Sequence, residues 1–240
     1  MDPQIKTIDC ACVIHGDAYS WDYVEKLYNM LSRHLTPKVR LHVYTEVERE
    51  VPDLYIKHIL EPWAITRPGR AWWYKMQLFN TEHHAGPLLY FDLDTVIVGN
   101  IDWICQQPTT YFWAPQDFKY LWRPMHFGLN SSVMWWDTRR YQYVWELFNQ
   151  QELAQNMQKY HGDQDFISTT IPENQRRFLD QDLILSWRWQ CLDGGYNFDK
   201  KRHLTPGTGT YFPDSARVLI FHGKPKPDQI TDSKILEHWQ

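Results

Sequence analysis

The sequence has 240 residues, a formal net charge of −4 at pH 7 and an aromatic content of 16%. A chain of this length can bury a sizeable core, as one large domain or as two small ones. The weak negative charge gives no general attraction to a phosphate backbone, so a nucleic-acid partner is not expected. The 13 tryptophans exceed what such a core requires; they either fill the core or stack on sugar rings and nucleobases.

Neither a membrane span nor a disulfide framework is expected. Residues 1–6 lack the layout of a signal peptide, and no apolar run approaches the roughly 20 residues of a spanning helix. The four cysteines, Cys10, Cys12, Cys105 and Cys191, are few and scattered, which favours buried reduced thiols over a metal or redox role. We therefore expect a soluble, cytoplasmic protein.

The chain begins with a predicted strand, turn and helix. Residues 6–14 form the strand, residues 15–20 form the turn, and Ser20 is predicted to cap a helix over 21–33. Ligands of open α/β sheets lie beyond the carboxyl ends of strands, so this turn is a candidate nucleotide contact.

Three residues of this turn suit a nucleotide. Gly16 allows the backbone to approach a ligand closely, while Asp17 and Tyr19 can hydrogen-bond to a base and stack on it. A plain turn without a ligand is the alternative.

Further strands are expected at 40–45 and 54–59, followed by a helix over 70–80. This helix is apolar on most sides and should be buried, which makes the charge of Lys75 unusual. Lys75 either extends to water or pairs with a phosphate or with the acidic residues described next.

Residues 88–91 read as a strand buried on both faces, and the strand ends at Asp92 and Asp94. A second apolar run, 96–98, closes on a Gly-Asn turn. Because ionised aspartate is almost never buried unpaired, we expect Asp92 and Asp94 to share a cation, and carboxylates with phosphate oxygens suit Mg²⁺ or Mn²⁺. The alternative is an ordinary acidic turn at a strand end.

The middle of the chain alternates strands with loops and helices. A strand is expected at 111–115, and the loop 116–129 has no periodicity and is a candidate acceptor site or lid. A strand at 133–136 then leads into a helix that Thr138 caps and that ends at residue 149.

Helical sequence continues over 150–160, and a further short helix begins at Asp163. Asp163 is either a simple helix cap or a functional carboxylate. The last strand, 216–221, runs into His222, Gly223 and two lysines, which together supply a metal ligand, a close-approach glycine and cations for a diphosphate. A terminal helix is expected at 231–239.

These motifs resemble the GT-A glycosyltransferases of family eight, the group that contains glycogenin and bacterial lipooligosaccharide galactosyltransferases. The resemblance covers residues 8–227, and the strongest matches are 90–102 and 162–164. It implies an α/β GT-A fold over 1–240, with a central mixed, mostly parallel sheet flanked by helices in a single domain. The nucleotide-binding half would be about 1–102 and the acceptor-side half about 103–227.

The resemblance also implies roles for individual residues. The segment 15–19 is similar to the family's first nucleotide-binding loop, with Tyr19 stacked on uracil. The family's metal histidine would fall at Ile220, but His222 lies two residues later on the same face of a strand and can still reach the cation. The other implied contacts to the donor, its diphosphate or its sugar are His15, Gly16, Asp17, Lys75, Asp92, Asp117, Asn130, Ser131, Gly223 and Lys226.

The predicted function is a metal-dependent, retaining transfer of a sugar from a nucleotide diphosphate sugar, with UDP expected, to a hydroxyl of a saccharide or other acceptor. Asp163 would orient donor hydroxyls, and the neutral amide of Gln164 would lie near the anomeric carbon. With no carboxylate nucleophile assigned, front-face attack by the acceptor is favoured.

Two other functions remain open. A haloacid-dehalogenase-like phosphatase would use Asp92 as its nucleophile, although the corresponding strand normally opens the chain and here 91 residues precede it. A non-catalytic protein that binds sugar nucleotides is the other alternative.

Overall fold

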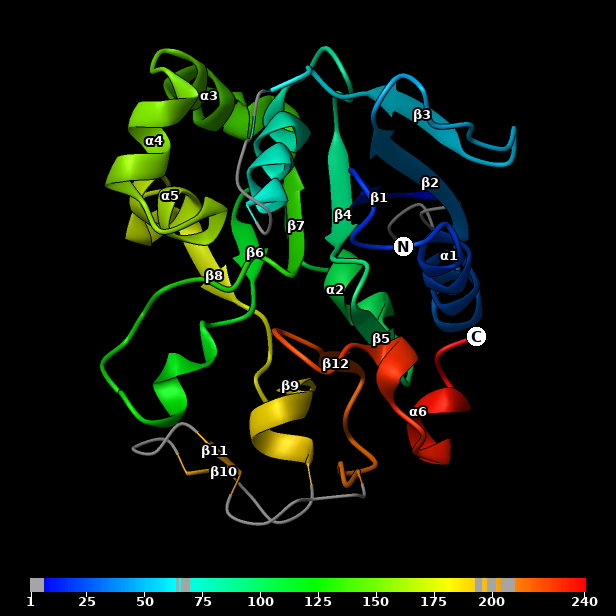
Figure 1. Ribbon diagram of the computed structural model, residues 1–240. Coiled ribbons are helices and arrows are strands. Elements are labelled where there is room, and N and C mark those ends of the chain that lie inside the picture. Colours follow the sequence, from blue (N-terminus) through cyan, green and yellow to red (C-terminus); the bar gives the residue numbers. More distant parts are fainter. Residues whose placement is uncertain (1–6, 64, 66–69, 193–195, 198–201, 204–209) are drawn as a thin grey trace, which may run out of the picture.

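The centre of the computed structural model is a seven-stranded sheet with the order β3-β2-β1-β4-β7-β6-β8 (Figure 1). Strands β3, β2, β1 and β4 are parallel, β7 is antiparallel to both of its neighbours, and β8 is parallel to β6. The sheet is therefore mixed and mostly parallel, as the alternation of strands and helices predicts. Its strands are β1 (Thr7–Val13), β2 (Lys38–Thr45), β3 (Ile56–Ile59), β4 (Pro87–Phe91), β6 (Phe112–Ala114), β7 (Val133–Asp137) and β8 (Arg176–Phe178). The structure describes residues 7–63, 65, 70–192, 196–197, 202–203 and 210–240.

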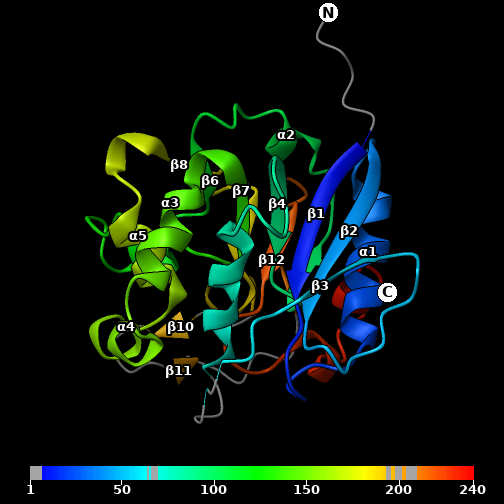
Figure 2. The ribbon, with the colours of Figure 1, turned by 90° about the horizontal axis from the view of Figure 1, so that it is seen from above.

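Helices cover both faces of this sheet (Figure 2). Successive side chains along β1 point to opposite faces of the sheet. Cys10 packs toward α1 (Asp22–His34), while Ala11 packs toward η1 (Ala71–Phe79) and α3 (Thr138–Asn149). Each face thus has its own apolar core. In the described part of the chain, no helix is long and apolar enough to cross a membrane. The other α-helices are α2 (Asp102–Cys105), α4 (Leu153–Lys159), α5 (Asp163–Thr170) and α6 (Ser233–Leu236).

A second, three-stranded sheet joins the middle of the chain to its end. β12 (Val218–Ile220) pairs antiparallel with β5 (Thr95–Ile97) and parallel with β9 (Ile184–Ser186). Beyond β12, the Phe221 N–H donates to the carbonyl of Asp94 over 3.2 Å. This pairing brings the segment after residue 221 beside the acidic residues that follow β4. A two-stranded sheet of β10 (Tyr196–Asn197) and β11 (Arg202–His203) is separate.

Two predicted helix caps are wrong. Helix α1 begins at Asp22 with Trp21 as its N-cap and no side-chain cap, so Ser20 does not cap it. The N-cap of α3 is Asp137, whose side chain accepts a hydrogen bond from the backbone N–H of Arg139. Thr138 is already inside the helix, because the preceding carboxylate satisfies the free N–H of the first turn.

Other boundaries differ from the predictions. The helix expected over 70–80 is present as the 3-10 helix η1, and the helix expected over 150–160 begins only at Leu153. The terminal helix is the single turn α6, which is shorter than the predicted 231–239. The three-residue strands β8 and β9 were not predicted, because such short runs carry no readable periodicity.

The cysteines and many of the tryptophans lie in the core. All four cysteines are buried and free, which confirms the prediction of reduced thiols. Trp73 and Trp136 are fully buried, and Trp136 stacks on Phe79 with ring centroids 5.1 Å apart. These tryptophans fill the core rather than offer a surface to sugars.

Candidate functional site

A cavity of about 590 Å³ opens at the edge of the central sheet where β1 and β4 end. Because these two strands are parallel, Val13 at the end of β1 and Asp92 just after β4 meet at the same edge. The volume is in the range of small-molecule sites. The predicted site residues that line it are His15, Tyr19, Lys75, Asp92, Asp94, Asn130, Ser131, Asp163, Gln164, His222, Gly223 and Lys226.

Three predicted site residues do not line this cavity. Gly16 has a positive φ of 64° and its carbonyl accepts a hydrogen bond from Arg49 over 2.7 Å, so it shapes the turn. Asp17 is exposed to solvent. Asp117 is buried next to the cavity, where its carboxylate accepts a hydrogen bond from the amide of Gln164 over 3.0 Å.

The carboxylate of Asp92 is held by two neighbours. Lys75 Nζ lies 2.9 Å from its Oδ1, and the Tyr90 hydroxyl donates to the same oxygen over 2.6 Å. The backbone N–H of Asp92 donates to the carbonyl of Ser132 over 2.8 Å, which ties this residue to the start of β7. Asp92 is thus fixed in both its backbone and its side chain.

Asp94 is more deeply buried, with 7% of its surface exposed. Its Oδ2 accepts a hydrogen bond from the Tyr19 hydroxyl over 3.0 Å and contacts the ammonium of Lys226. Burial and the nearby charge of Asp92 raise the pKa of Asp94, against the opposing effects of Lys226 and Tyr19. The two carboxylates therefore need positive charge beside them.

Lys75 is a buried cation between two carboxylates. It is 7% exposed, and its Nζ lies 2.9 Å from Asp92 and 3.2 Å from Asp163. It also donates to the Ser131 hydroxyl over 3.2 Å. Burial by itself would lower the pKa of Lys75, but Asp163 and Asp92 outweigh burial and raise it. The predicted pairing with the acidic residues is confirmed, and the alternative of extension to water is wrong.

The start of α5 places two polar side chains at the cavity. Asp163 is 5% exposed and accepts a hydrogen bond from the Ser131 hydroxyl over 2.7 Å, so it is not a simple helix cap. Gln164 follows it, and its Oε1 accepts a hydrogen bond from the amide of Asn130 over 3.3 Å. With Asp117 as the acceptor of its own amide, Gln164 has a fixed orientation.

His222 lines the cavity, but its ring forms a hydrogen bond with Ser186 and not with the two aspartates. Its Nε2 lies 2.6 Å from the hydroxyl of Ser186 at the end of β9. Burial, with help from neighbouring cations, lowers the pKa of His222 to about 4, so the ring is neutral at pH 7. Among the described residues, the donor atoms of Asp92, Asp94 and His222 do not all lie within 4.8 Å of one another.

The cavity residues that the sequence did not assign to the site include Trp72 and Tyr90, while Lys224 lines the cavity as one of the two lysines expected there. Tyr90 stands two positions before Asp92, and the alternation of side chains along a strand could have placed both on one face. Trp72 is 38% exposed and reaches the rim from η1. No sequence signal separates it from the neighbouring core residue Trp73.

The cavity's donor set fits a hard divalent cation. Asp92 and Asp94 would hold Mg²⁺ or Mn²⁺ through carboxylate oxygens, with phosphate oxygens or water completing the coordination. The contact of Lys226 with Asp94 shows that this carboxylate accepts a positive charge at the cavity wall. The same ammonium would have to move aside for the ion.

The comparisons with known proteins bear on the fold alone. No protein-family model and no curated protein matches the sequence. An active-site glutamine-to-glutamate mutant of LgtC matches with a TM-score of 0.64 at 12% identity, covering 96% of this chain and 94% of that one. The galactosyltransferase LgtC in complex with donor and acceptor sugar analogues matches with a TM-score of 0.61 at 14% identity, covering 92% and 89%.

Mouse xyloside xylosyltransferase 1 also matches, with a TM-score of 0.54 at 15% identity, covering 91% of this chain and 100% of that one. The matched structures are glycosyltransferases, and the chain shares their GT-A fold. The fold that the sequence resemblance predicted is therefore confirmed.

Proposed function

We propose that this protein is a metal-dependent glycosyltransferase that moves a sugar from a UDP-sugar to an acceptor hydroxyl with retention at the anomeric carbon. The observation that carries the proposal is the convergence of Asp92, Asp94, Asp163, Gln164 and three lysines on one cavity of a GT-A fold. These groups come from distant parts of the sequence, and packing of a core does not require them. The cavity can take a nucleotide sugar by its size.

The cations of the cavity would act on the leaving group. As the bond between the sugar and the diphosphate breaks, negative charge grows on the diphosphate oxygens. Lys226, and Lys224 beside it, would bind these oxygens, while Asp92 and Asp94 hold the metal ion. The bound ion would supply Lewis-acid stabilisation of the same charge.

Side chains at the start of α5 would hold the sugar. Asp163, paired with Lys75 and hydrogen-bonded to Ser131, would accept hydrogen bonds from donor hydroxyls. Gln164 would lie near the anomeric carbon, and Asn130 and Asp117 would hold its amide there in one orientation. A neutral amide stabilises an oxocarbenium-like centre without forming a stable adduct, which leaves front-face attack by the acceptor.

One comparison supports the presence of a glutamine in the active site of this fold. The active site of LgtC contains a glutamine that was changed to glutamate in a matching structure. LgtC is a galactosyltransferase and another matched enzyme is a xylosyltransferase, so the fold accommodates different sugars. We therefore assign the reaction class and leave the sugar to experiment.

The test is release of UDP from a panel of UDP-sugars with Mn²⁺. We expect hydrolysis or transfer with one sugar, and a loss of at least about 100-fold in the folded Asp94→Asn variant, since it removes one of the two carboxylates that would hold the metal ion. The surface variant Asp22→Asn, on the exposed side of α1, is the matched control. An Asp94→Asn variant as active as the parent would overturn the metal assignment.

Two further readouts separate the alternatives. Phosphatase activity on a generic phosphoester that Asp92→Asn abolishes would favour the phosphatase, in which Asp92 is the nucleophile. The hydrogen bond from Tyr90 and the ion pair with Lys75 argue against that role, because both make the carboxylate a weaker nucleophile. Binding of UDP-sugar without hydrolysis or transfer to any acceptor would favour a binding protein.

A further inference from the structure

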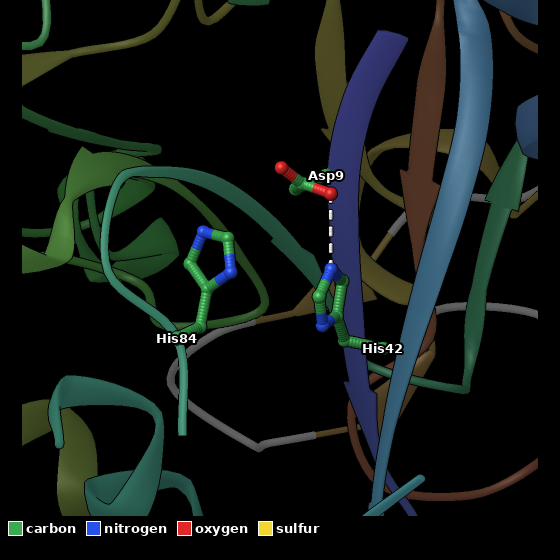
Figure 3. Close-up of side chains that lie close together, drawn as sticks. All are labelled: Asp9, His42 and His84. Atoms are coloured by element: carbon green, nitrogen blue, oxygen red, sulfur yellow. Dashed lines mark hydrogen bonds and ion pairs between the residues drawn. The ribbon is translucent and has the colours of Figure 1, made fainter. Parts of the chain in front are cut away.

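A second cluster of ligand-type side chains lies on the central sheet, away from the candidate cavity. Asp9 comes from β1, His42 from β2 and His84 from the turn before β4, and Figure 3 shows the three side chains facing a common space. Their ligand atoms all lie within 4.8 Å of one another. No other group of three or more such side chains was found among the residues that the structure describes.

This cluster is at the other end of the parallel strands from the cavity. Asp9 is the third residue of β1, whereas the cavity begins at Val13, the last residue of that strand. At about 3.3 Å per residue, the two positions are about 13 Å apart along the strand. The cluster therefore has no part in the proposed sugar transfer.

The donor atoms are already arranged around one point. His42 is 5% exposed, and its Nε2 lies 3.0 Å from Asp9 Oδ1. The ring of His84 meets the ring of His42 edge-on, with centroids 4.8 Å apart. Two imidazoles and one carboxylate form a ligand set that suits Zn²⁺, and a partly exposed Asp9 and His84 leave room for water as a fourth ligand.

Neighbouring side chains hold these ligands in place. His58 Nε2 lies 2.8 Å from His42 Nδ1, so His58 can accept the Nδ1–H of a His42 that binds metal through Nε2. Arg40 forms an ion pair with Asp9 in which its Nη2 lies 2.7 Å from Oδ2. Because Arg40 is half exposed, its guanidinium can move aside from the oxygen that faces His42.

We propose that Asp9, His42 and His84 form a Zn²⁺ site that joins β1 and β2 to the turn preceding β4. With the ion bound at Nε2, His42 would carry its one ring hydrogen on Nδ1, facing His58 Nε2. Since the turn precedes β4 directly, Zn²⁺ would stabilise the sheet at the end opposite the cavity.

The test is a Zn²⁺ titration of the full chain, without a polyhistidine tag, against a chromogenic chelator. We expect one Zn²⁺ per chain in the parent and in Asp94→Asn, and an affinity at least tenfold weaker in His84→Asn and in Asp9→Asn. His83→Asn is the matched control: His83 is the adjacent, equally half-buried histidine of the same turn, and its ring meets those of Tyr44 and His58 without offering a ligand atom to the cluster. This control should stay within about twofold of the parent.

Several results would overturn the site. These are a parent chain that does not compete with the chelator, a His84→Asn variant that binds as the parent does, or a loss of Zn²⁺ binding in Asp94→Asn. The last result would place the ion in the cavity. Circular dichroism identifies any variant that fails to fold, and Asp9→Asn then tests the proposal in place of His84→Asn.

Discussion

At the scale of single residues, the buried ion pairs of the cavity decide the chemistry of the site. Lys75 lies between Asp92 and Asp163, and Lys226 contacts Asp94. Each charged side chain has lost water on burial and gained an ion-pair partner in its place. Removing one partner is therefore costly, because the other charge stays buried without compensation. These pairs also hold the carboxylates of Asp163 and Asp92 in place at the cavity.

Replacing Lys75 should destabilise the chain strongly. Lys75→Met leaves Asp92 and Asp163 buried without their cation, and we expect a loss of about 3–5 kcal/mol in the free energy of unfolding. The control Lys26→Met removes the exposed ion pair with Asp22 on α1 and should cost at most about 1 kcal/mol. Urea unfolding followed by tryptophan fluorescence measures both. Equal losses in the two variants would show that Lys75 is not a buried counter-ion.

His222 should make stability depend on pH. Its pKa of about 4 in the folded chain is below the ordinary value of about 6.5, so the unfolded chain binds the proton more tightly. Its contribution is therefore fully present above pH 6.5 and is lost as the pH falls toward 4. In metal-free buffer, the parent should lose about 2 kcal/mol more than His222→Gln between pH 7 and pH 5.

Urea unfolding at the two pH values gives this difference. The matching substitution at His161, which is exposed in the folded chain, is the control and should leave the pH dependence of the parent unchanged. If His222→Gln and the parent lose the same stability, the ring of His222 is not the group that titrates.

Much of the site was predictable at this scale, and some of it was not. Asp92 and Asp94 stand out because charges next to apolar runs have no structural reason to be there, whereas the family resemblance supplied the role of Asp163. Asp117 was expected to contact the donor, but its carboxylate instead accepts a hydrogen bond from the amide of Gln164. A position in the sequence does not tell which way a loop side chain points. Tyr90 was missed although its spacing from Asp92 placed it on the same face.

At the scale of secondary-structure elements, the sequence predicted whether a segment is a helix or a strand better than it predicted where that element begins and ends. The strands ending at 45, 91 and 136 were expected close to where they occur, because buried apolar runs are distinctive. Helix starts were less certain, since Ser20, Thr138 and Asp137 are all good capping residues. Only the backbone geometry decides which of them has its side chain beside a free N–H.

The cap of α3 provides a prediction at this scale. Asp137→Ala removes the acceptor for the Arg139 N–H, and we expect a loss of about 1 kcal/mol in the free energy of unfolding. Asp137→Ser keeps a capping oxygen and should retain most of the stability. Urea unfolding of the two variants measures the difference. A serine variant as unstable as the alanine variant would assign the effect to the ion pair with Arg139 instead.

At the scale of the whole molecule, long-range pairing was the part that the sequence could not predict. β12 and β5 are separated by about half of the chain. An apolar run indicates that a strand is buried, but it does not indicate which other strand it pairs with. Yet this pairing places His222 and Lys226 beside Asp94, so the site depends on it. The family resemblance supplied what local patterns could not, because it carries the arrangement of the whole fold.

Binding at the cavity should therefore stabilise the entire chain. The cavity is lined by residues from Val13 to Lys226, so a bound nucleotide ties together segments that separate on unfolding. At a UDP concentration of 100 times its Kd with Mn²⁺, mass action gives about 2.7 kcal/mol, or about 5–10 °C in Tm for a chain of this size. Differential scanning fluorimetry measures the shift. Asp94→Asn should lose most of it while Asp22→Asn keeps it, and an undiminished shift in Asp94→Asn would place UDP outside this cavity.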